Sequence, residues 1–252
     1  MSFDLAQLNL RKDQVINLKK ELGISGQKAE VALALDYSYS MEDEYRTGYC
    51  QRAVERLLAL GLAFDDNGAI DMYLFHNGVI TIPEAITKDN LAGYVNRVTA
   101  GKGMGGTSYA PFINQIVADT GCPTPGVQPA KKGLLGGLFG KSTTATIEPP
   151  VKLTHPKYVI VITDGDNADK VETEAAMRHA SKFGIFWQFV GIGNAGFAFL
   201  DKLDNLSGRV IDNANFFKLP NLDNTSDDVL YKSLLKEFPD WIPQARKNDM
   251  IL

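Results

Sequence analysis

Residues 30–40 read EVALALDYSYS, a short apolar run that leads directly into a polar loop. The run 31–35 is entirely apolar, which is typical of a strand buried on both faces of a parallel sheet. A second run, YVIVIT at 158–163, is also apolar and ends in the polar turn DGD at 164–166. The two runs predict central parallel strands with polar residues at their carboxyl ends.

Segments on either side of these strands alternate between helix and strand patterns. The Asn77-Gly78 dipeptide favours a tight hairpin and hence an antiparallel edge strand. We therefore predict an α/β fold: a doubly wound, mostly parallel sheet with one antiparallel edge strand and helices on both faces. The predicted helices are 45–64, 89–98, 110–117, 172–183, 197–206 and 227–238, and the further strands are 69–75, 78–82, 185–190 and 208–211.

The chain of 252 residues is predicted to form one domain preceded by a short arm. Residues 1–28 are the N-terminal arm, an amphipathic segment that suits either a strand-plus-helix arm or a linker stub, and 29–252 are the domain. Within it, 121–152 contains five prolines, several glycines and a Ser/Thr run. This composition predicts an insertion loop.

Composition narrows the classes of partner and compartment. The net charge of -4 and pI of about 5.4 provide no field that attracts nucleic acid or anionic lipid. The N-terminus lacks a secretory signal pattern, and no apolar run is long enough to span a bilayer. Cys50 and Cys122 are too few for a disulfide scaffold and do not belong to a zinc motif. We expect a cytoplasmic protein that does not bind nucleic acid or membranes.

Polar side chains follow both central strands and also occur in a glycine-rich loop. Asp36, Ser38 and Ser40 follow the first strand, Thr107 lies in the loop GKGMGGTSY at 101–109, and Asp164 follows the strand 158–163. In an extended loop, residues two apart face the same side. All five are hard oxygen donors, which suit Mg²⁺. The sequence predicts a magnesium site at the carboxyl edge of the sheet.

These three parts, DYSYS at 36–40, GTS at 106–108 and TDG at 163–165, resemble the metal-ion-dependent adhesion site of von Willebrand factor A domains. The family usually has glycine where Tyr39 stands. The resemblance implies that Ser38, Ser40 and Thr107 bind the ion directly, and that Asp36 and Asp164 bind it directly or through water. The ion implied is Mg²⁺, with Mn²⁺ or Ca²⁺ as alternatives.

The resemblance also implies a function, namely protein binding in which an Asp or Glu carboxylate of the partner completes the coordination of the ion. Tyr37, Tyr39, Ser108 and Asp166 would form the partner-facing rim, although one tyrosine ring could instead lie in the core. The segment INLKKELG and the insertion are similar to an intracellular bacterial branch associated with tellurium resistance and chemical stress. A non-enzymatic binding module in a stress response is the expectation.

Two alternatives remain open at this point. A hydrolase or phosphoryl-transfer enzyme could use the same ion, but it needs a base or nucleophile, and only Asp166 stands near. The pattern GIGNAG at 191–196, with Asp212 beyond it, meets the dinucleotide-binding context, although it follows a late strand. The similar pattern at 101–106 follows a helix, and GKS at 140–142 lacks the first glycine of a phosphate-binding loop because residue 135 is Leu.

Overall fold

The computed structural model describes residues 4–64, 68–124, 126–127, 151–193 and 196–252. It contains one six-stranded sheet in the order β3-β2-β1-β4-β5-β6, in which every neighbouring pair is parallel except β2 and β3. The predicted fold class is confirmed. The strands are β1 Glu30–Asp36, β2 Ile70–Phe75, β3 Val79–Ile86, β4 Lys157–Thr163, β5 Ile185–Ile192 and β6 Ala214–Leu219.

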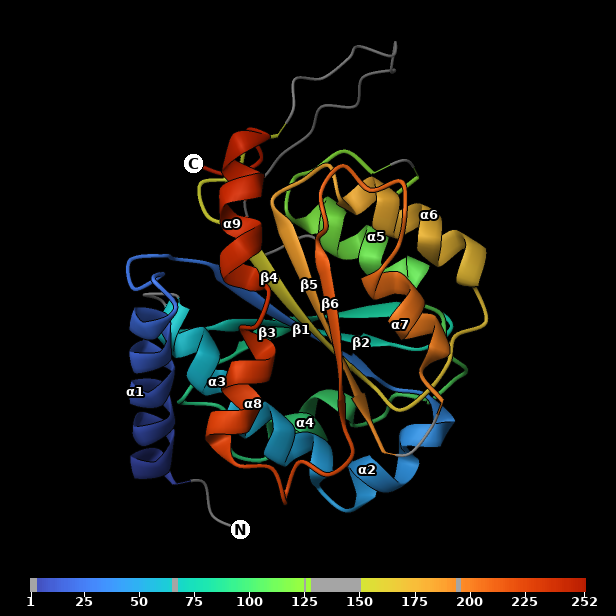
Figure 1. Cartoon of the computed structure of the whole chain (residues 1–252). Coiled ribbons are helices and arrows are strands. Elements are labelled where there is room, and N and C mark those ends of the chain that lie inside the picture. The colour runs from blue at the N-terminus through green and yellow to red at the C-terminus, as the bar shows by residue number, and fades with distance from the viewer. Residues whose placement is uncertain (1–3, 65–67, 125, 128–150, 194–195) are drawn as a thin grey trace, which may run out of the picture.

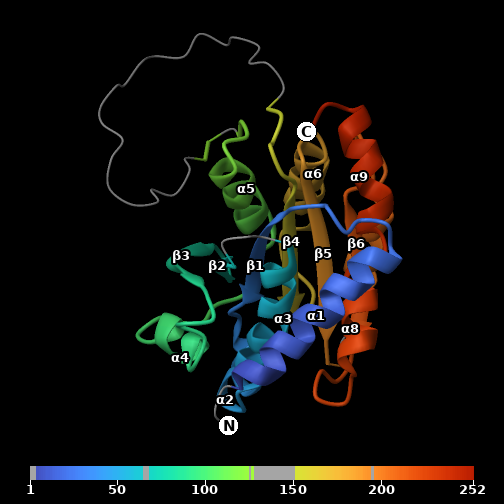
Figure 2. The same ribbon diagram turned by 90° about the vertical axis from the view of Figure 1, so that its left-hand side faces the viewer.

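Helices cover both faces of this sheet (Figures 1 and 2). One face packs against α3, α8 and α9, with α1 lying outside α3, and the other face packs against α5, α6 and α7. The helices are α1 Leu5–Glu21, α2 Glu42–Arg46, α3 Tyr49–Phe64, α4 Tyr94–Thr99, α5 Ala110–Asp119, α6 Lys170–Ala180, α7 Ala198–Asp204, α8 Asp227–Leu234 and α9 Phe238–Lys247, and a 3₁₀ turn, η1, spans Tyr39–Met41.

The central strands are apolar on both faces because each face has its own hydrophobic core. Leu33 and Leu35 of β1 point into the core with α3, whereas Ala32 and Ala34 point into the core with α5. Successive side chains of a strand alternate between faces, so every position of a strand that is covered on both sides favours an apolar residue. The polar residues of this region are therefore confined to the strand ends.

The strand order places the carboxyl ends of β1 and β4 side by side. From β1 the chain runs outward to β2 and β3, and later from β4 outward to β5 and β6, so β1 and β4 meet where the winding reverses. In open α/β sheets ligands bind outside the carboxyl ends of the strands at this point. The loops after β1 and β4 are the two that carry DYSYS and DGD.

The structure corrects several predicted elements. Residues 208–211, predicted as a strand, contain the end of a turn and a bend, and the sixth strand is β6 at Ala214–Leu219. Gly208 has a φ of 80°, and the Arg209 guanidinium donates to the carbonyls of Leu206 and Asp204 at 2.8 and 2.7 Å. These contacts turn the chain before it can extend.

The helical segments differ in similar ways. The arm contains helix α1, which begins at an Asp4 cap and packs on α3 and α8. The predicted helix 45–64 is divided at Gly48, whose φ is 74°, and a further helix, α9, follows α8. The predicted insertion lies largely outside the described residues, which exclude 125 and 128–150. In the part of the chain that the structure describes, no helix is both long and apolar enough to cross a membrane.

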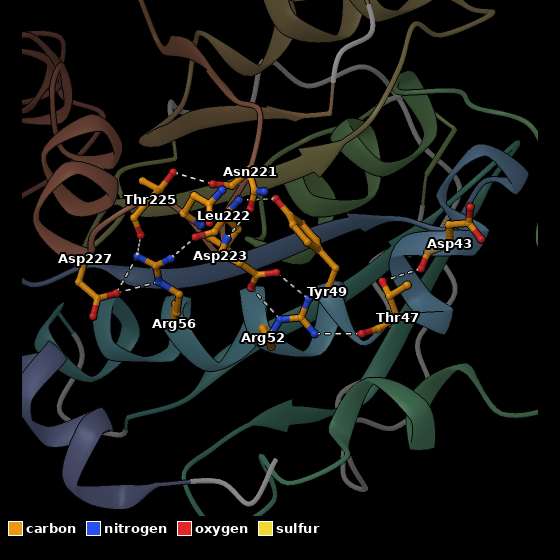
Figure 3. A network of polar contacts seen from close by, with 11 residues as sticks. Asp43, Thr47, Tyr49, Arg52, Arg56, Asn221, Leu222, Asp223, Thr225 and Asp227 are labelled. Atoms are coloured by element: carbon orange, nitrogen blue, oxygen red, sulfur yellow. Dashed lines mark hydrogen bonds and ion pairs between the residues drawn. The ribbon is translucent and has the colours of Figure 1, made fainter.

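A network of arginine contacts fastens the loop between β6 and α8 to α3 (Figure 3). Arg52 forms a two-point ion pair with Asp223 at 2.8 and 2.9 Å. Arg56 donates to Asp227 at 2.7 Å and to the carbonyls of Leu222 and Thr225 at 2.6 and 2.8 Å. The loop 220–226 is thereby held along α3.

Candidate metal centre

Asp36 is the last residue of β1, and its side chain is fully buried. One carboxylate oxygen accepts the Ser38 amide N–H at 2.9 Å, and the other accepts the Thr163 hydroxyl at 2.6 Å. The Tyr45 hydroxyl donates to the Asp36 carbonyl at 2.7 Å. These contacts fix the carboxylate between the carboxyl ends of β1 and β4.

Above Asp36, two serine hydroxyls and a second carboxylate come together. The Oγ atoms of Ser38 and Ser40 lie 3.0 Å apart, and Ser40 donates to Asp164 Oδ1 at 2.8 Å. Ser38 is buried, Asp164 is half-buried and Ser40 is exposed. The cluster is closed on the side of the sheet and open to solvent on the other.

The glycine-rich loop brings Thr107 to the same edge through backbone contacts. Gly105 pairs with the DYSYS loop, since its carbonyl accepts from Tyr39 N–H at 2.9 Å and its N–H donates to the Tyr37 carbonyl at 3.3 Å. The Thr107 carbonyl accepts from Ala168 N–H in the loop after β4 at 2.9 Å. All five predicted ligand residues therefore lie in three loops that are hydrogen-bonded to one another.

The donor set fits a small, hard cation. Mg²⁺ prefers six oxygens at 2.0–2.1 Å, and the edges of that octahedron are about 2.9 Å long. The Ser38–Ser40 and Ser40–Asp164 oxygen separations of 3.0 and 2.8 Å match such edges, although hydrogen bonds hold them without an ion as well. Among residues 4–64, 68–124, 126–127, 151–193 and 196–252, no three His, Cys, Asp or Glu side chains are grouped to hold a metal. A site here would therefore depend on hydroxyls.

The electrostatics of the cluster oppose an ionised Asp36 in the absence of a cation. Burial raises the pKa of Asp36 to about 6, hydrogen bonds from Thr163 and Ser38 work against this rise, and the nearby charge of Asp164 adds to it. Burial also raises the pKa of Asp164. A cation beside both carboxylates would offset these costs.

The predicted rim residues divide between surface and core. Tyr39 is 69% exposed, Asp166 is exposed and pairs with Lys170, and Ser108 is half-buried. Tyr37 is only 7% exposed, so its assignment to the rim is corrected. Its hydroxyl donates to the Lys102 carbonyl at 3.0 Å and its ring packs edge-on against Tyr45, because the 3₁₀ turn that follows directs only Tyr39 outward.

Asp169 is a structural residue of this site that the sequence did not reveal. Its carboxylate accepts the backbone N–H groups of Tyr109 and Ala110, each at 2.9 Å, at the start of α5. Asn167 Nδ2 and the Thr173 hydroxyl also donate to it, at 2.7 and 3.2 Å. Asp169 thus ties the loop after β4 to the loop that carries Thr107.

We expect Asp169→Ala to lower the free energy of unfolding by about 2 kcal/mol, because two helical N–H groups and two side-chain donors lose their acceptor. Urea unfolding followed by circular dichroism measures the effect. Asp166→Ala is the control, since Asp166 is an exposed neighbour whose carboxylate pairs with Lys170 at the surface and accepts the adjacent Asn167 N–H at 3.0 Å. Equal stability of the two variants would contradict this role for Asp169.

The glycine pattern at 191–196 serves packing at its first position. A Cβ on Gly191 would lie 2.8–2.9 Å from three ring atoms of Phe197, so this glycine makes room for a buried aromatic ring. Asp212, the acidic residue expected on a ribose, pairs with Arg209 at 2.7 Å. Residues 194–195 lie outside the described residues. Neither described feature supports a dinucleotide site.

The fold and the sequences of the three loops are those of a von Willebrand factor A domain. Residues 28–129 and 144–251 match the family described as vWA-TerF-like, the vWA domain found in the TerF C terminus, and the chain belongs to that family. An uncharacterised protein of Bacillus subtilis strain 168, YcbR, is 32% identical over 251 residues, which cover 98% of this chain and 91% of YcbR.

Solved structures of a mussel byssus protein, proximal thread matrix protein 1, share the fold. One aligns with a TM-score of 0.54 at 14% identity, and another, described with a zinc-occupied MIDAS motif, aligns with 0.53 at 15% identity. Each alignment covers 83% of this chain and 47% of the mussel chain, so the present chain spans about half the length of those structures. At this identity the likeness extends to the fold alone.

Proposed function

We propose that this domain binds a protein partner through a divalent metal ion held at the metal-ion-dependent adhesion site, with Mg²⁺ as the ion and Mn²⁺ or Ca²⁺ as substitutes. The observation that carries the proposal is the convergence of Asp36, Ser38, Ser40 and Asp164 through hydrogen bonds of 2.6–3.0 Å, which include those from the Ser38 amide N–H and the Thr163 hydroxyl to Asp36. Thr107 lies in a loop that is hydrogen-bonded to the loop after β1 and to the loop after β4. The mussel structure with zinc at its MIDAS motif supports a metal in this class of site.

The ion would be held by the hydroxyls of Ser38, Ser40 and Thr107, with Asp36 and Asp164 acting directly or through water. Both oxygens of Asp36 already accept hydrogen bonds inside the protein, which favours contact through water for this residue. Neutral hydroxyl ligands leave much of the ion's charge uncompensated, so an anionic ligand from outside is favoured. An Asp or Glu side chain of a partner supplies that ligand.

The surface around the cluster suits protein contact. Tyr39 stands next to the exposed Ser40 and offers a rigid aromatic surface, the kind of residue that contributes strongly to interfaces. Asp166 and Ser108 complete the rim. We propose a binding module in a cytoplasmic response to tellurium or chemical stress, a setting that rests on the family to which the chain belongs.

Binding is favoured over catalysis because a hydrolytic or phosphoryl-transfer reaction would need a base beside the ion. Asp166, the residue singled out for this role, forms an ion pair with Lys170 at the surface. Asp36 is buried below the serines with both oxygens engaged. Neither arrangement presents a free base toward a substrate on the open side.

The test is calorimetric titration of Mg²⁺ and Mn²⁺ into chelator-treated protein. We expect one saturable site in the wild type and an affinity at least about 10-fold weaker in Thr107→Ala, which loses one ligand. Ser108→Ala is the matched control, since it removes the adjacent hydroxyl, and it should bind as the wild type does. Absence of a saturable site, or equal affinity in wild type and Thr107→Ala, would refute the proposed site.

A further inference from the structure

The turn between β2 and β3 lies against the glycine-rich loop that carries Thr107. His76, Asn77 and Gly78 form this turn, in which His76 N–H donates to the Gly78 carbonyl at 2.9 Å and Gly78 N–H donates to His76 Nδ1 at 3.1 Å. The turn is thus closed by its own hydrogen bonds. Its remaining polar groups are available to the neighbouring loop.

Two of those groups hold the residues on either side of Thr107. Asn77 Oδ1 accepts the Gly106 N–H at 2.6 Å, and the His76 carbonyl accepts the Ser108 N–H at 2.9 Å. On its opposite side the Thr107 carbonyl accepts from Ala168. The backbone is therefore hydrogen-bonded at Gly106, Thr107 and Ser108. The hairpin turn accepts from Gly106 and Ser108, and Ala168 donates to Thr107.

The glycines of the loop permit this close approach. A Cβ on Gly105 would lie 2.6 Å from Asn77 Oδ1 and 3.2 Å from the His76 Cβ, and a Cβ on Gly106 would lie 3.0 Å from Asn77 Nδ2. By contrast, Gly103 in the same loop has no atom within 4 Å of such a Cβ. The loop is glycine-rich at 105 and 106 because the hairpin turn fills the space where side chains would be.

We propose that Asn77 is a positioning residue of the metal site, which sets the place of the Thr107 hydroxyl through the Gly106 N–H without touching the ion. This role rests on the proposed function, since it requires Thr107 to be a ligand. The Asn77 side chain is exposed at the turn and has no part in the hydrophobic cores, so its contact with Gly106 is separable from folding.

If Asn77 positions Thr107, its loss should affect the affinities for Mg²⁺ and Ca²⁺ differently. A purely structural role of Asn77 would not produce this difference. Mg²⁺ demands near-ideal octahedral geometry, whereas Ca²⁺ accepts longer and more irregular coordination. A displaced Thr107 therefore weakens Mg²⁺ binding more than Ca²⁺ binding. A general loosening of the protein would weaken both to the same extent.

The experiment measures Mg²⁺ and Ca²⁺ affinity by titration for Asn77→Ala, Asn77→Asp, Gly105→Ala and Gly103→Ala. Asn77→Ala should weaken Mg²⁺ binding about five-fold, the range expected for one hydrogen bond, and Ca²⁺ binding less than about two-fold. Asn77→Asp, which keeps an acceptor oxygen, should recover most of the Mg²⁺ affinity. Gly105→Ala should resemble Asn77→Ala, and Gly103→Ala should resemble the wild type.

A double variant identifies the route of the effect. If Asn77 acts through Thr107, Asn77→Ala causes no further loss in a Thr107→Ala background. Full additivity, equal losses for Mg²⁺ and Ca²⁺, or wild-type affinity in Asn77→Ala would overturn the positioning role while leaving the metal site intact. Failure of the wild type to bind either ion would instead overturn the proposed function.

Discussion

In the presence of a chelator, Asp36→Asn is expected to unfold at a higher temperature than the wild type, although it removes a residue of the proposed metal site. The wild-type carboxylate is fully buried, and burial raises its pKa to about 6 from 3.8. At neutral pH the folded protein therefore carries a buried negative charge. This charge lowers the free energy of unfolding by at most about 3 kcal/mol. Removing the charge should raise the melting temperature by about 5 °C.

The amide can keep both hydrogen bonds of the carboxylate, although the second hydrogen of its Nδ2 gains no acceptor, which offsets part of the gain. Its oxygen can accept from Ser38 N–H, and its Nδ2 can donate to Thr163 Oγ1. The Thr163 hydroxyl is then free to donate to the Tyr109 oxygen 3.1 Å away, while Tyr109 continues to donate to the Gly165 carbonyl at 2.7 Å. The substitution therefore reverses one hydrogen bond and removes none.

The pH dependence follows from the sign of the shift. Because the pKa of Asp36 is higher in the folded protein, the folded state binds more protons between pH 4 and 6, and its stability falls as pH rises through that window. The difference in the free energy of unfolding between Asp36→Asn and the wild type should reach its maximum above pH 7 and be small near pH 4. Melting curves in chelator at several pH values measure it.

Mg²⁺ at 1,000 times the dissociation constant should reverse the order, since the wild type then gains about 4.1 kcal/mol, more than the buried charge costs, and the variant gains nothing. Asp43→Asn is the control, because Asp43 is an exposed aspartate on the neighbouring α2. It should change the melting temperature by about 1 °C at most. A destabilised Asp36→Asn in chelator would show that the buried charge is compensated in a way that the structure does not display.

Sequence reasoning could place the five candidate ligand residues at one edge of the sheet because that placement depends on simple rules. Strands that are apolar on both faces leave polar residues only at their ends, and parallel strands bring those ends to one edge. The same reasoning did not find Asn77 and Asp169, whose hydrogen bonds reach backbone groups 29 and about 60 residues away. Such contacts depend on where a turn meets a loop, which no local pattern encodes.

The misplaced sixth strand and the orientation of Tyr37 have related causes. Residues 208–211 and 214–219 are both short and partly apolar, so either segment could have formed the sixth strand. Hydrogen bonds from the Arg209 side chain to the carbonyls of Leu206 and Asp204 favour a turned conformation in the first segment. The alternation of tyrosine and serine after β1 left either ring free to be buried. The start of η1 at Tyr39 decided it, since only Tyr37 continues the extended backbone.

Arg56→Ala is expected to lower the free energy of unfolding by about 3 kcal/mol, the lower end for breaking a buried ion pair. The Arg56 side chain is only 10% exposed and makes three contacts, with Asp227 and with the carbonyls of Leu222 and Thr225 (Figure 3). Without it, two carbonyls lose their charged donor, and Asp227 keeps only Arg11 at 3.0 Å among the arginines. Urea unfolding measures the loss.

Two comparisons make this prediction specific to the network. Lys232→Ala removes an exposed pair with Asp228 on α8 and should cost less than about 0.5 kcal/mol. Arg56→Lys keeps the charge but not the planar fork that reaches three acceptors, so it should recover only part of the loss. Because none of these contacts involves a ligand residue, the loss should be the same in chelator and in Mg²⁺. A loss that appeared only with Mg²⁺ would mean that the loop 220–226 belongs to the metal site, and the separation of stability from ion binding would have to be abandoned.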